Sequence, residues 1–449
     1  MMKKTVCLLA LIFIVHSETY TQETQTINLE QVRSLALANS RSLAKYNLSI
    51  ENSIRDERVQ LYAMLPSVSA EYNASMHYLN RDWSLVNPID TFNTGFNFAV
   101  TQKIFEGGKS FIQKSINAIA TESVRNEALA EYFNVLDSAD SAYYAVLEAA
   151  ATLEASESAL ESAASSLAIA EIRQISGMIN QSDYLKALAD NEAQANSRNQ
   201  ARRNLSLNIT KLKSLIGTSG NPKLEQIDLI EHEALIQRLG SISDEDAGTL
   251  YGKFWEIIST ANPSLAKEVL NNQRAEKNLS LTKRDYSPTL DATIFKGTMR
   301  HSTAGGFKNS SEGGVSLSGR IPIDFWVYSN RMEKSKIAVD SAKLDFVSTE
   351  IQLETELQSA LISIFTQAES VLSSRRSLAY TEKYFEAVQE RYRLNQSSVS
   401  DLGDASTLFI TSRNNLIKAS FGFLQSLSRL RSLGAIDDEQ KLVRILMGS

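Results

Sequence analysis

The chain has 449 residues, a formal net charge of −6, and only 6 prolines and 19 glycines. Its 43% hydrophobic and 22% charged residues exclude a disordered chain. Because the sequence has no basic stripe, it also argues against a nucleic-acid partner. The scarcity of proline and glycine predicts long, uninterrupted elements.

The N-terminus has the pattern of an export signal. Lys3 and Lys4 precede an apolar run over residues 6–15, and polar residues follow. This pattern predicts a signal peptide over residues 1–21, with cleavage near residue 17 or 21. The one cysteine, Cys7, lies inside the apolar run. Its removal leaves no thiol for a disulfide, a metal site or nucleophilic catalysis.

Residues 22–217 form a first predicted repeat. A helical stretch from about residue 29 to 64 ends at Leu65-Pro66-Ser67, and apolar residues then alternate with polar ones in a β-hairpin over 67–102. Two helices follow, over 108–176 and 182–216. The longer one carries apolar residues seven apart, as in a coiled-coil seam, at Tyr132, Ala139, Val146, Leu153, Leu160 and Leu167.

The remaining sequence repeats this plan about 220 residues later. Ser42-Leu43-Ala44-Lys45 recurs as Ser264-Leu265-Ala266-Lys267. An intervening segment, 218–249, precedes a second repeat over 250–434, and residues 435–449 form a tail. The second repeat has a β-hairpin over 289–323, where Lys296 interrupts the alternation, and helices over 326–394 and 401–433. A duplication of this length indicates two copies of a half-domain.

The strands pose a problem of pairing. Four strands from one chain cannot close a barrel, and an open strand edge cannot lie in lipid. If the strands enter a membrane, several copies of the chain must share one barrel. The alternative is a periplasmic helical protein with two water-soluble hairpins.

The ordered, duplicated set of motifs resembles the TolC family of outer membrane efflux proteins. The motifs are Leu29-Glu30-Gln31, Leu65-Pro66-Ser67 and Phe105-Glu106-Gly107-Gly108; the second-half equivalent of the last, Pro322-Ile323-Asp324-Phe325-Trp326, lacks the glycines. The resemblance implies a mainly α fold with a small β part. Long coiled-coil hairpins in tandem duplication would form an α-barrel tunnel, and four strands per chain would contribute to a 12-stranded trimeric β-barrel. Residues 218–249 would surround the waist of the tunnel.

The resemblance also implies a function. The chain would be a homotrimeric exit duct in the outer membrane of a Gram-negative bacterium, with a large periplasmic portion. Its partners would be outer-membrane lipid, a periplasmic adaptor protein and an inner-membrane pump of the RND or ABC class. Its substrates would be drugs, metals or other small molecules. The alternatives are a type I protein secretion duct and a non-channel trimeric coiled-coil protein of the envelope.

Two acidic residues form the candidate gate. Asp401 and Asp404 are three apart at the start of a predicted helix, so both carboxylates lie on one face. They fit helix N-terminal aspartates that complement the helix dipole. The resemblance instead assigns them to the constricted periplasmic entrance, where six carboxylates in a trimer would bind cations and have elevated pKa values. Because no basic residue lies between Arg393 and Asp404, a latch that uses an arginine in that turn has to be built differently.

The two helical turns are the candidate contacts for the adaptor. Gly177 and Asn395 occupy equivalent positions, and both tolerate the left-handed conformation that ends a helix. The residues assigned to the adaptor contact by the resemblance are Gly177, Met178, Asn180, Ser182, Asn395, Gln396 and Ser398. His77, His232 and His301 fall in different predicted elements, so we expect no metal site. We find no catalytic or cofactor-binding motif and expect no enzymatic activity.

Overall fold

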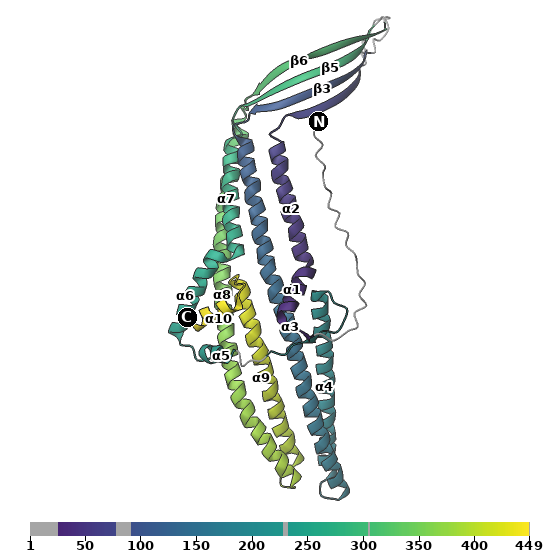
Figure 1. Ribbon diagram of the computed structural model, residues 1–449, viewed down its shortest axis with the longest axis vertical. Coiled ribbons are helices and arrows are strands. Elements are labelled where there is room, and N and C mark those ends of the chain that lie inside the picture. The colour runs from purple at the N-terminus through teal and green to yellow at the C-terminus, as the bar shows by residue number, and fades with distance from the viewer. Residues whose placement is uncertain (1–25, 78–90, 228–231, 304–305, 449) are drawn as a thin grey trace, which may run out of the picture.

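The computed structural model describes residues 26–77, 91–227, 232–303 and 306–448; the predicted signal peptide lies outside these residues. The molecule is elongated, with a β-sheet at one end and the tips of two helical hairpins at the other (Figure 1). Small helices surround the middle of the long ones. We call this middle region the waist.

The first half contains α1 (Leu29–Asn39), α2 (Arg41–Tyr62), β2 (Ser67–His77), β3 (Thr91–Phe105), α3 (Lys109–Ile175) and α4 (Gln181–Ile216). The single helix predicted from about residue 29 to 64 is therefore two helices. Ser40 has an extended backbone (ψ 112°) and its Oγ accepts a hydrogen bond from the Leu43 amide at 3.2 Å. A serine in this role starts a new helix, which explains the break.

The second half contains α6 (Asp244–Ala261), α7 (Pro263–Lys283), β5 (Thr289–Thr303), β6 (Gly306–Arg320), α8 (Phe325–Arg393) and α9 (Val399–Leu433). Helix α6 runs across the predicted boundary at residue 249. It ends where the Asn262 side chain caps α7 and Pro263 takes the first helical position, which needs no amide donor. Between the halves lie β4 (Lys223–Leu224) and α5 (Glu233–Leu239), and the tail forms α10 (Glu439–Met447).

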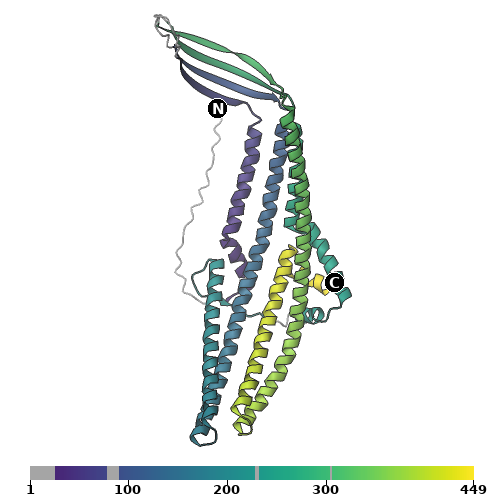
Figure 2. The same cartoon turned by 180° about the vertical axis from the view of Figure 1, so that it is seen from behind.

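Most of the molecule is a single curved layer. Helices α3 and α8 have 67 and 69 residues, so each is about 100 Å long at 1.5 Å per residue. In the half next to the sheet the packing order is α2-α3-α7-α8, and in the half that leads to the tips it is α4-α3-α9-α8 (Figure 1, Figure 2). On α8, Leu357, Ile364 and Val371 lie seven residues apart and are fully buried against these neighbours. None of the described helices combines the length and apolar character needed to cross a bilayer.

The four-stranded sheet has the order β2-β3-β5-β6, and every pair is antiparallel. Even-numbered residues of β2, β3 and β5 share one face with odd-numbered residues of β6, and we call this the outer face. Tyr72 pairs there with Phe96, and Val100 with Ile294. The remaining residues form the opposite face, which we call the concave face because Asn73, Asn97 and other polar residues line a hollow on it. The alternation predicted from the sequence therefore separates an apolar face from a polar one.

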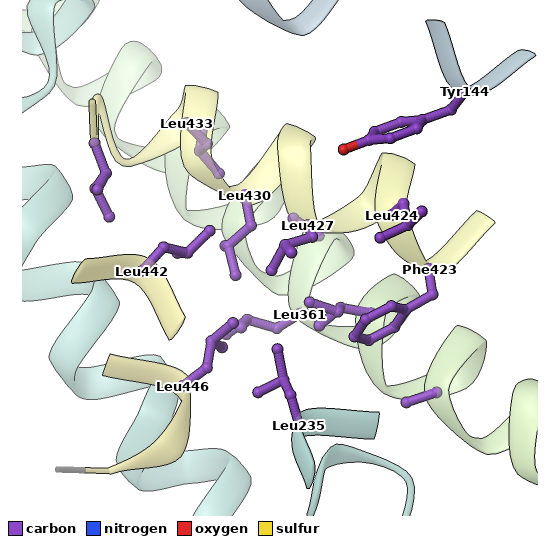
Figure 3. Packing of buried hydrophobic residues seen from close by; sticks show 14 of the residues in the cluster. Tyr144, Leu235, Leu361, Phe423, Leu424, Leu427, Leu430, Leu433, Leu442 and Leu446 are labelled. Carbon is purple, nitrogen blue, oxygen red and sulfur yellow. The ribbon is translucent and has the colours of Figure 1, made fainter. Parts of the chain in front are cut away.

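The main hydrophobic core lies at the waist. Side chains from α5, α8, α9 and α10 interdigitate there (Figure 3). Phe423, Leu430, Leu442 and Leu446 have an exposed fraction of zero. Strands β1 (Thr26–Ile27) and β4 pair in parallel beside this core and join the start of the chain to its centre. The tail is thus part of the packed waist.

A buried ion cluster connects the waist helices. The fully buried Asp140 carboxylate on α3 accepts two hydrogen bonds from Arg33 on α1, at 2.6 and 2.9 Å. It also accepts one from Arg431 on α9 at 2.9 Å and one from the Ser428 hydroxyl at 2.7 Å. The bidentate geometry and four donors satisfy a charge that burial would otherwise make costly. One carboxylate therefore joins both repeats of the chain.

The Asp140→Asn variant tests this connection. The substitution removes the anion that Arg33 and Arg431 share. Arg33 keeps a 3.4 Å contact with Glu439, but Arg431 is left buried without an ion-pair partner among the described residues, so we expect a loss of about 3–5 kcal/mol of stability. Thermal unfolding followed by far-ultraviolet circular dichroism measures the loss. Glu122→Gln is the control, because Glu122 is 52% exposed in its ion pair with Arg125 and its removal should cost less than about 1 kcal/mol. Equal effects of the two variants would contradict a structural role for the cluster.

Candidate functional site

Both hairpin turns at the tips end their long helix in the same way. Gly177 (φ 70°) and Asn395 (φ 61°) adopt the left-handed conformation. The following amides, of Met178 and Gln396, donate to the carbonyls five residues earlier at 2.8 and 2.7 Å. This is the Schellman arrangement, in which one left-handed residue satisfies the last carbonyls of a helix. The two turns are thus equivalent in geometry as well as in sequence.

The shorter helices also start alike. The Asn180 side chain accepts from the Asp183 amide at 2.8 Å, and the Ser398 hydroxyl accepts from the Asp401 amide at 3.1 Å. In the second turn the Asp401 carboxylate in return accepts from the Ser398 amide at 3.0 Å. This reciprocal pair is a capping box, which satisfies two helix donors at once. Asp401 therefore stabilises the start of α9.

The two candidate gate residues lie on one exposed face of α9, but they differ in their contacts. Hydrogen bonds from the Ser398 amide, then from the hydroxyls of Ser398 and Ser397, hold the pKa of Asp401 below its usual value. In the single chain this direction is opposite to the one expected for a ring of carboxylates. The exposed Asp404 carboxylate makes no hydrogen bond or ion pair with any described residue. Only Asp401 carries a structural role in addition to its charge.

An arginine that the sequence did not single out as functional joins the two tips. Arg173, on the last turn of α3, is buried, and its guanidinium donates to the Tyr392 carbonyl and, at 3.4 Å, to the Arg393 carbonyl. It also lies over the Tyr392 ring, 4.5 Å from the centroid. The C-terminal carbonyls of a helix favour a cation, so Arg173 caps α8 from the other hairpin. Its counterpart in the second repeat, Arg391, is exposed and bonds within its own turn.

A small apolar cluster surrounds this contact. It contains Ala170, Ala187, Val388, Tyr392, Val399, Leu402 and Ala405, all buried. Burial raises the pKa of Tyr392, whose hydroxyl has no hydrogen-bond partner among the described residues. Nearby, Lys186 on α4 donates to the Ser400 hydroxyl at 2.8 Å. A side chain at Gly403 would approach Asp190 to 3.2 Å, so this glycine lets α4 and α9 pack closely. The tips are closed against each other within one chain.

The predicted adaptor residues divide into two groups. Gly177, Asn180, Asn395 and Ser398 shape the turns through the backbone and capping geometry described above. Met178, Ser182 and Gln396 are exposed at the ends of the hairpins. Met178 also continues an exposed apolar strip formed by Ile172 and Ile175 on α3. The tips therefore present an apolar surface that is larger than the turns alone indicate.

The histidines are separated in space. His232 occupies the N-cap position of α5 without a side-chain capping hydrogen bond, and its ring lies near Phe423, whereas His301 on β5 bonds to the Asn93 side chain at 3.2 Å. The His77 side chain lies outside the described residues. Among the residues that the structure describes, no group of three or more histidine, cysteine or acidic side chains could hold a metal ion.

This architecture, with an amphipathic sheet on long helical hairpins, is that of an outer-membrane channel subunit. The family model described as outer membrane efflux protein matches residues 32–218 and 258–435. The chain therefore belongs to the outer membrane efflux protein family, which confirms the resemblance to TolC. Members of this family are outer-membrane channels with a large periplasmic part, and the chain shares that location. Its relatives are channel proteins rather than enzymes.

Individual relatives agree with this assignment. The chain is 22% identical to outer membrane protein TolC of Escherichia coli (strain K12) over 447 residues, which cover 94% of this chain and 85% of that protein. The structure of the CmeC outer membrane channel of Campylobacter jejuni has a TM-score of 0.72 at 16% identity and covers 92% of this chain and 88% of its own. The CusC structure has a TM-score of 0.74 at 14% identity, and the match covers 90% of this chain and 91% of the CusC chain. These likenesses show the fold, and with the family they identify an efflux duct.

The contact made by Arg173 can be tested by removal. Arg173→Met keeps an apolar stem but loses hydrogen bonds from a charged donor, which contribute about 1.5–3 kcal/mol. We expect the tips to separate more often, so limited proteolysis at residues 394–398 should accelerate about tenfold or more.

Arg391→Met is the matched control, because it removes the equivalent arginine of the other repeat from an exposed site. Its cleavage rate should stay near that of the unaltered protein. If both variants were cleaved at the same rate, Arg173 would not hold the tips together.

Proposed function

We propose that three copies of this chain form a closed duct that passes small molecules from an inner-membrane pump to the outside. The observation that carries the proposal is the pair of open edges of the curved layer. Strands β2 and β6 lie at the two edges of the sheet, and each has one side that no other described strand pairs with. An unpaired strand edge in lipid is strongly unfavourable, and pairing β6 of one copy with β2 of the next removes it. Three copies of four strands then give a barrel of 12.

The helices beneath the sheet have open edges on the same two sides. On α8, apolar side chains at heptad spacing are exposed, among them Ile337 (67%), Leu344 (70%) and Ile351 (57%). On α2, at the other edge, Leu48 (67%), Val59 (64%) and Tyr62 (66%) are exposed. A head-to-tail contact whose rotation closes gives a ring. Contact of α8 with α2 of the next copy would bury both stripes in one step.

The family supports the number of copies and the mode of action. Its members form trimeric channels that work with adaptor proteins and pumps. In our proposal the periplasmic adaptor contacts the hairpin tips, and an RND or ABC pump supplies the energy. The polar concave face of the sheet lines the exit. Asp401 and Asp404 line the periplasmic entrance, where six carboxylates would favour cations.

Leu344→Glu tests the proposed edge contact. A carboxylate in the centre of the α8 stripe would have to be buried at the interface without a partner, which is costly. The expected result is a folded chain that no longer forms trimers, measured by native mass spectrometry and circular dichroism in detergent.

Ala338→Glu is the control for this variant. Ala338 is also exposed on α8 but lies about 120° around the helix from Leu344, at 100° per residue. This variant should remain trimeric. If Leu344→Glu assembled as well as Ala338→Glu, the α8 stripe would not be an interface.

Asp404→Asn tests the gate without disturbing the fold, because Asp404 takes no part in the capping box. In planar bilayers the cation preference should fall, and block by trivalent cations from the periplasmic side should weaken by about tenfold or more. The reason is that Coulomb attraction depends on the charge of the ring in a poorly screened space.

The double variant Asp401→Asn with Asp404→Asn should reduce the cation preference further. The asparagine at position 401 still offers an oxygen that accepts a hydrogen bond from the Ser398 amide. Asp183→Asn on α4, at the position equivalent to Asp401, is the comparison and should change selectivity less. Unchanged selectivity and block in both Asp404→Asn and the double variant would place the constriction elsewhere.

A further inference from the structure

The outer face of the sheet has an unbalanced charge. Among its described residues the only charged side chains are Lys296 and Arg300, both on β5. The acidic residues of the sheet, Glu71, Asp291 and Glu312, lie on the concave face, where Glu312 pairs with Gly297. No carboxylate forms an ion pair with Lys296 or Arg300 in the described part of the chain. Two cations thus share an otherwise uncharged face.

These cations occupy one half of the strands. Near the helices, the outer face of β5 and β6 carries Leu290, Ala292, Ile294, Val315 and Leu317. Farther from the helices the same face carries Lys296, Thr298, Arg300, Asn309 and Ser311. At the level of Thr298, β3 and β2 still present Phe96 and Tyr72. Since β6 is the uppermost strand and β2 the lowest (Figure 1), the polar half of β5 and β6 is the part of the outer face farthest from the helices.

A hollow of about 470 Å³ on the outer face has Arg300 in its wall. It is lined by Tyr72, Thr94, Phe96, Thr298, Asn309 and Ser311 besides Arg300 itself. The guanidinium carbon lies 4.4 Å from the centroid of the Phe307 ring, and this contact holds the side chain across the strands. The hollow therefore combines an aromatic wall with a fixed cation.

Lys296 lies four residues nearer to the helices, about 13 Å away along the strand at 3.3 Å per residue. A side chain at the paired Gly313 would come within 3.7 Å of the Lys296 Cγ, so the lysine stem lies over the glycine. A long cationic side chain on a lipid-facing surface extends toward the headgroups. Together Lys296 and Arg300 place two positive charges near the outer boundary of the proposed membrane band.

We propose that Lys296 and Arg300 bind the phosphate groups of a phosphorylated lipid in the outer leaflet of the outer membrane. The inference rests on the proposed function, because it needs the outer face to contact lipid. Arginine matches a phosphate with two parallel hydrogen bonds, and lysine binds it as a point charge. The aromatic wall of the hollow offers a surface for the acyl chains. Because the face carries no acidic residue, an anion is the ligand that its charge favours.

The test uses the purified full-length protein in detergent. Native mass spectrometry measures binding of lipid A with its phosphates and of the same lipid after enzymatic dephosphorylation. The unaltered protein should bind the phosphorylated form at least tenfold more tightly. In the double variant Lys296→Gln with Arg300→Gln, the preference for the phosphorylated form should fall to about twofold or less.

Lys308→Gln is the matched control. Lys308 lies on β6 opposite His301, at the same end of the sheet, but on the concave face. It should keep the preference of the unaltered protein. Arg300→Lys, which keeps the charge but loses the paired hydrogen bonds, should show an intermediate preference. If the double variant does not assemble, the single variants Lys296→Gln and Arg300→Gln provide the measurement.

Two kinds of failure are distinguishable. A protein that does not trimerise or conduct in bilayers would overturn the proposed function. A conducting trimer that binds both lipid forms equally, or that loses the preference in Lys308→Gln as much as in Arg300→Gln, would overturn the lipid site alone. A preference retained in the double variant would also overturn it.

Discussion

The thinness of the chain determines most of its structure. A compact domain satisfies its strand edges and apolar surfaces internally, but this molecule is one layer of helices and strands over most of its length. Within the layer, α3 has neighbours on two sides, whereas α2, α4 and α8 lie at its edges and have a neighbour on one side. The exposed stripes on α2 and α8, and the open edges of β2 and β6, all follow from this geometry. A single layer can bury them only by joining another layer edge to edge.

The waist compensates for that thinness. It is the one region where α1, α5, α6 and α10 cover the long helices, and it contains most of the hydrophobic core. The Asp140 cluster joins α1, α3 and α9 at this level. Beyond the waist the two hairpins depend on a small apolar cluster and on Arg173. Stability is therefore concentrated at the centre, whereas the tips are held by few contacts.

The sequence predicted the features that depend on local chemistry. The two Schellman turns follow from Gly177 and Asn395, and the amphipathic faces of the strands follow from alternation with period two. Ser40 was missed as a helix start because the apolar pattern continues on both sides of it. The contacts of Arg173 and Asp140 join residues 219 and 291 positions apart. No local pattern shows which of two equivalent arginines, Arg173 or Arg391, is buried. The lowered pKa of Asp401 likewise depends on the reciprocal geometry of a turn that the sequence indicates only in outline.

The tip contacts also bear on how a duct of this kind stays closed at rest. Hydrogen bonds from one buried, charged side chain contribute about 1.5–3 kcal/mol, and a stacked cation adds about 0.5–1 kcal/mol or more. In one chain such a sum allows separation in a small fraction of molecules. In the proposed trimer a wide opening requires all three tips to separate together, so the three contributions add to about 6–12 kcal/mol. Thermal motion would then open the whole ring rarely, because the population of the open ring falls tenfold for each 1.4 kcal/mol. A partner that binds the separated tips more tightly than the closed ones could supply this difference, because a ligand shifts an equilibrium only by its differential affinity for the two states.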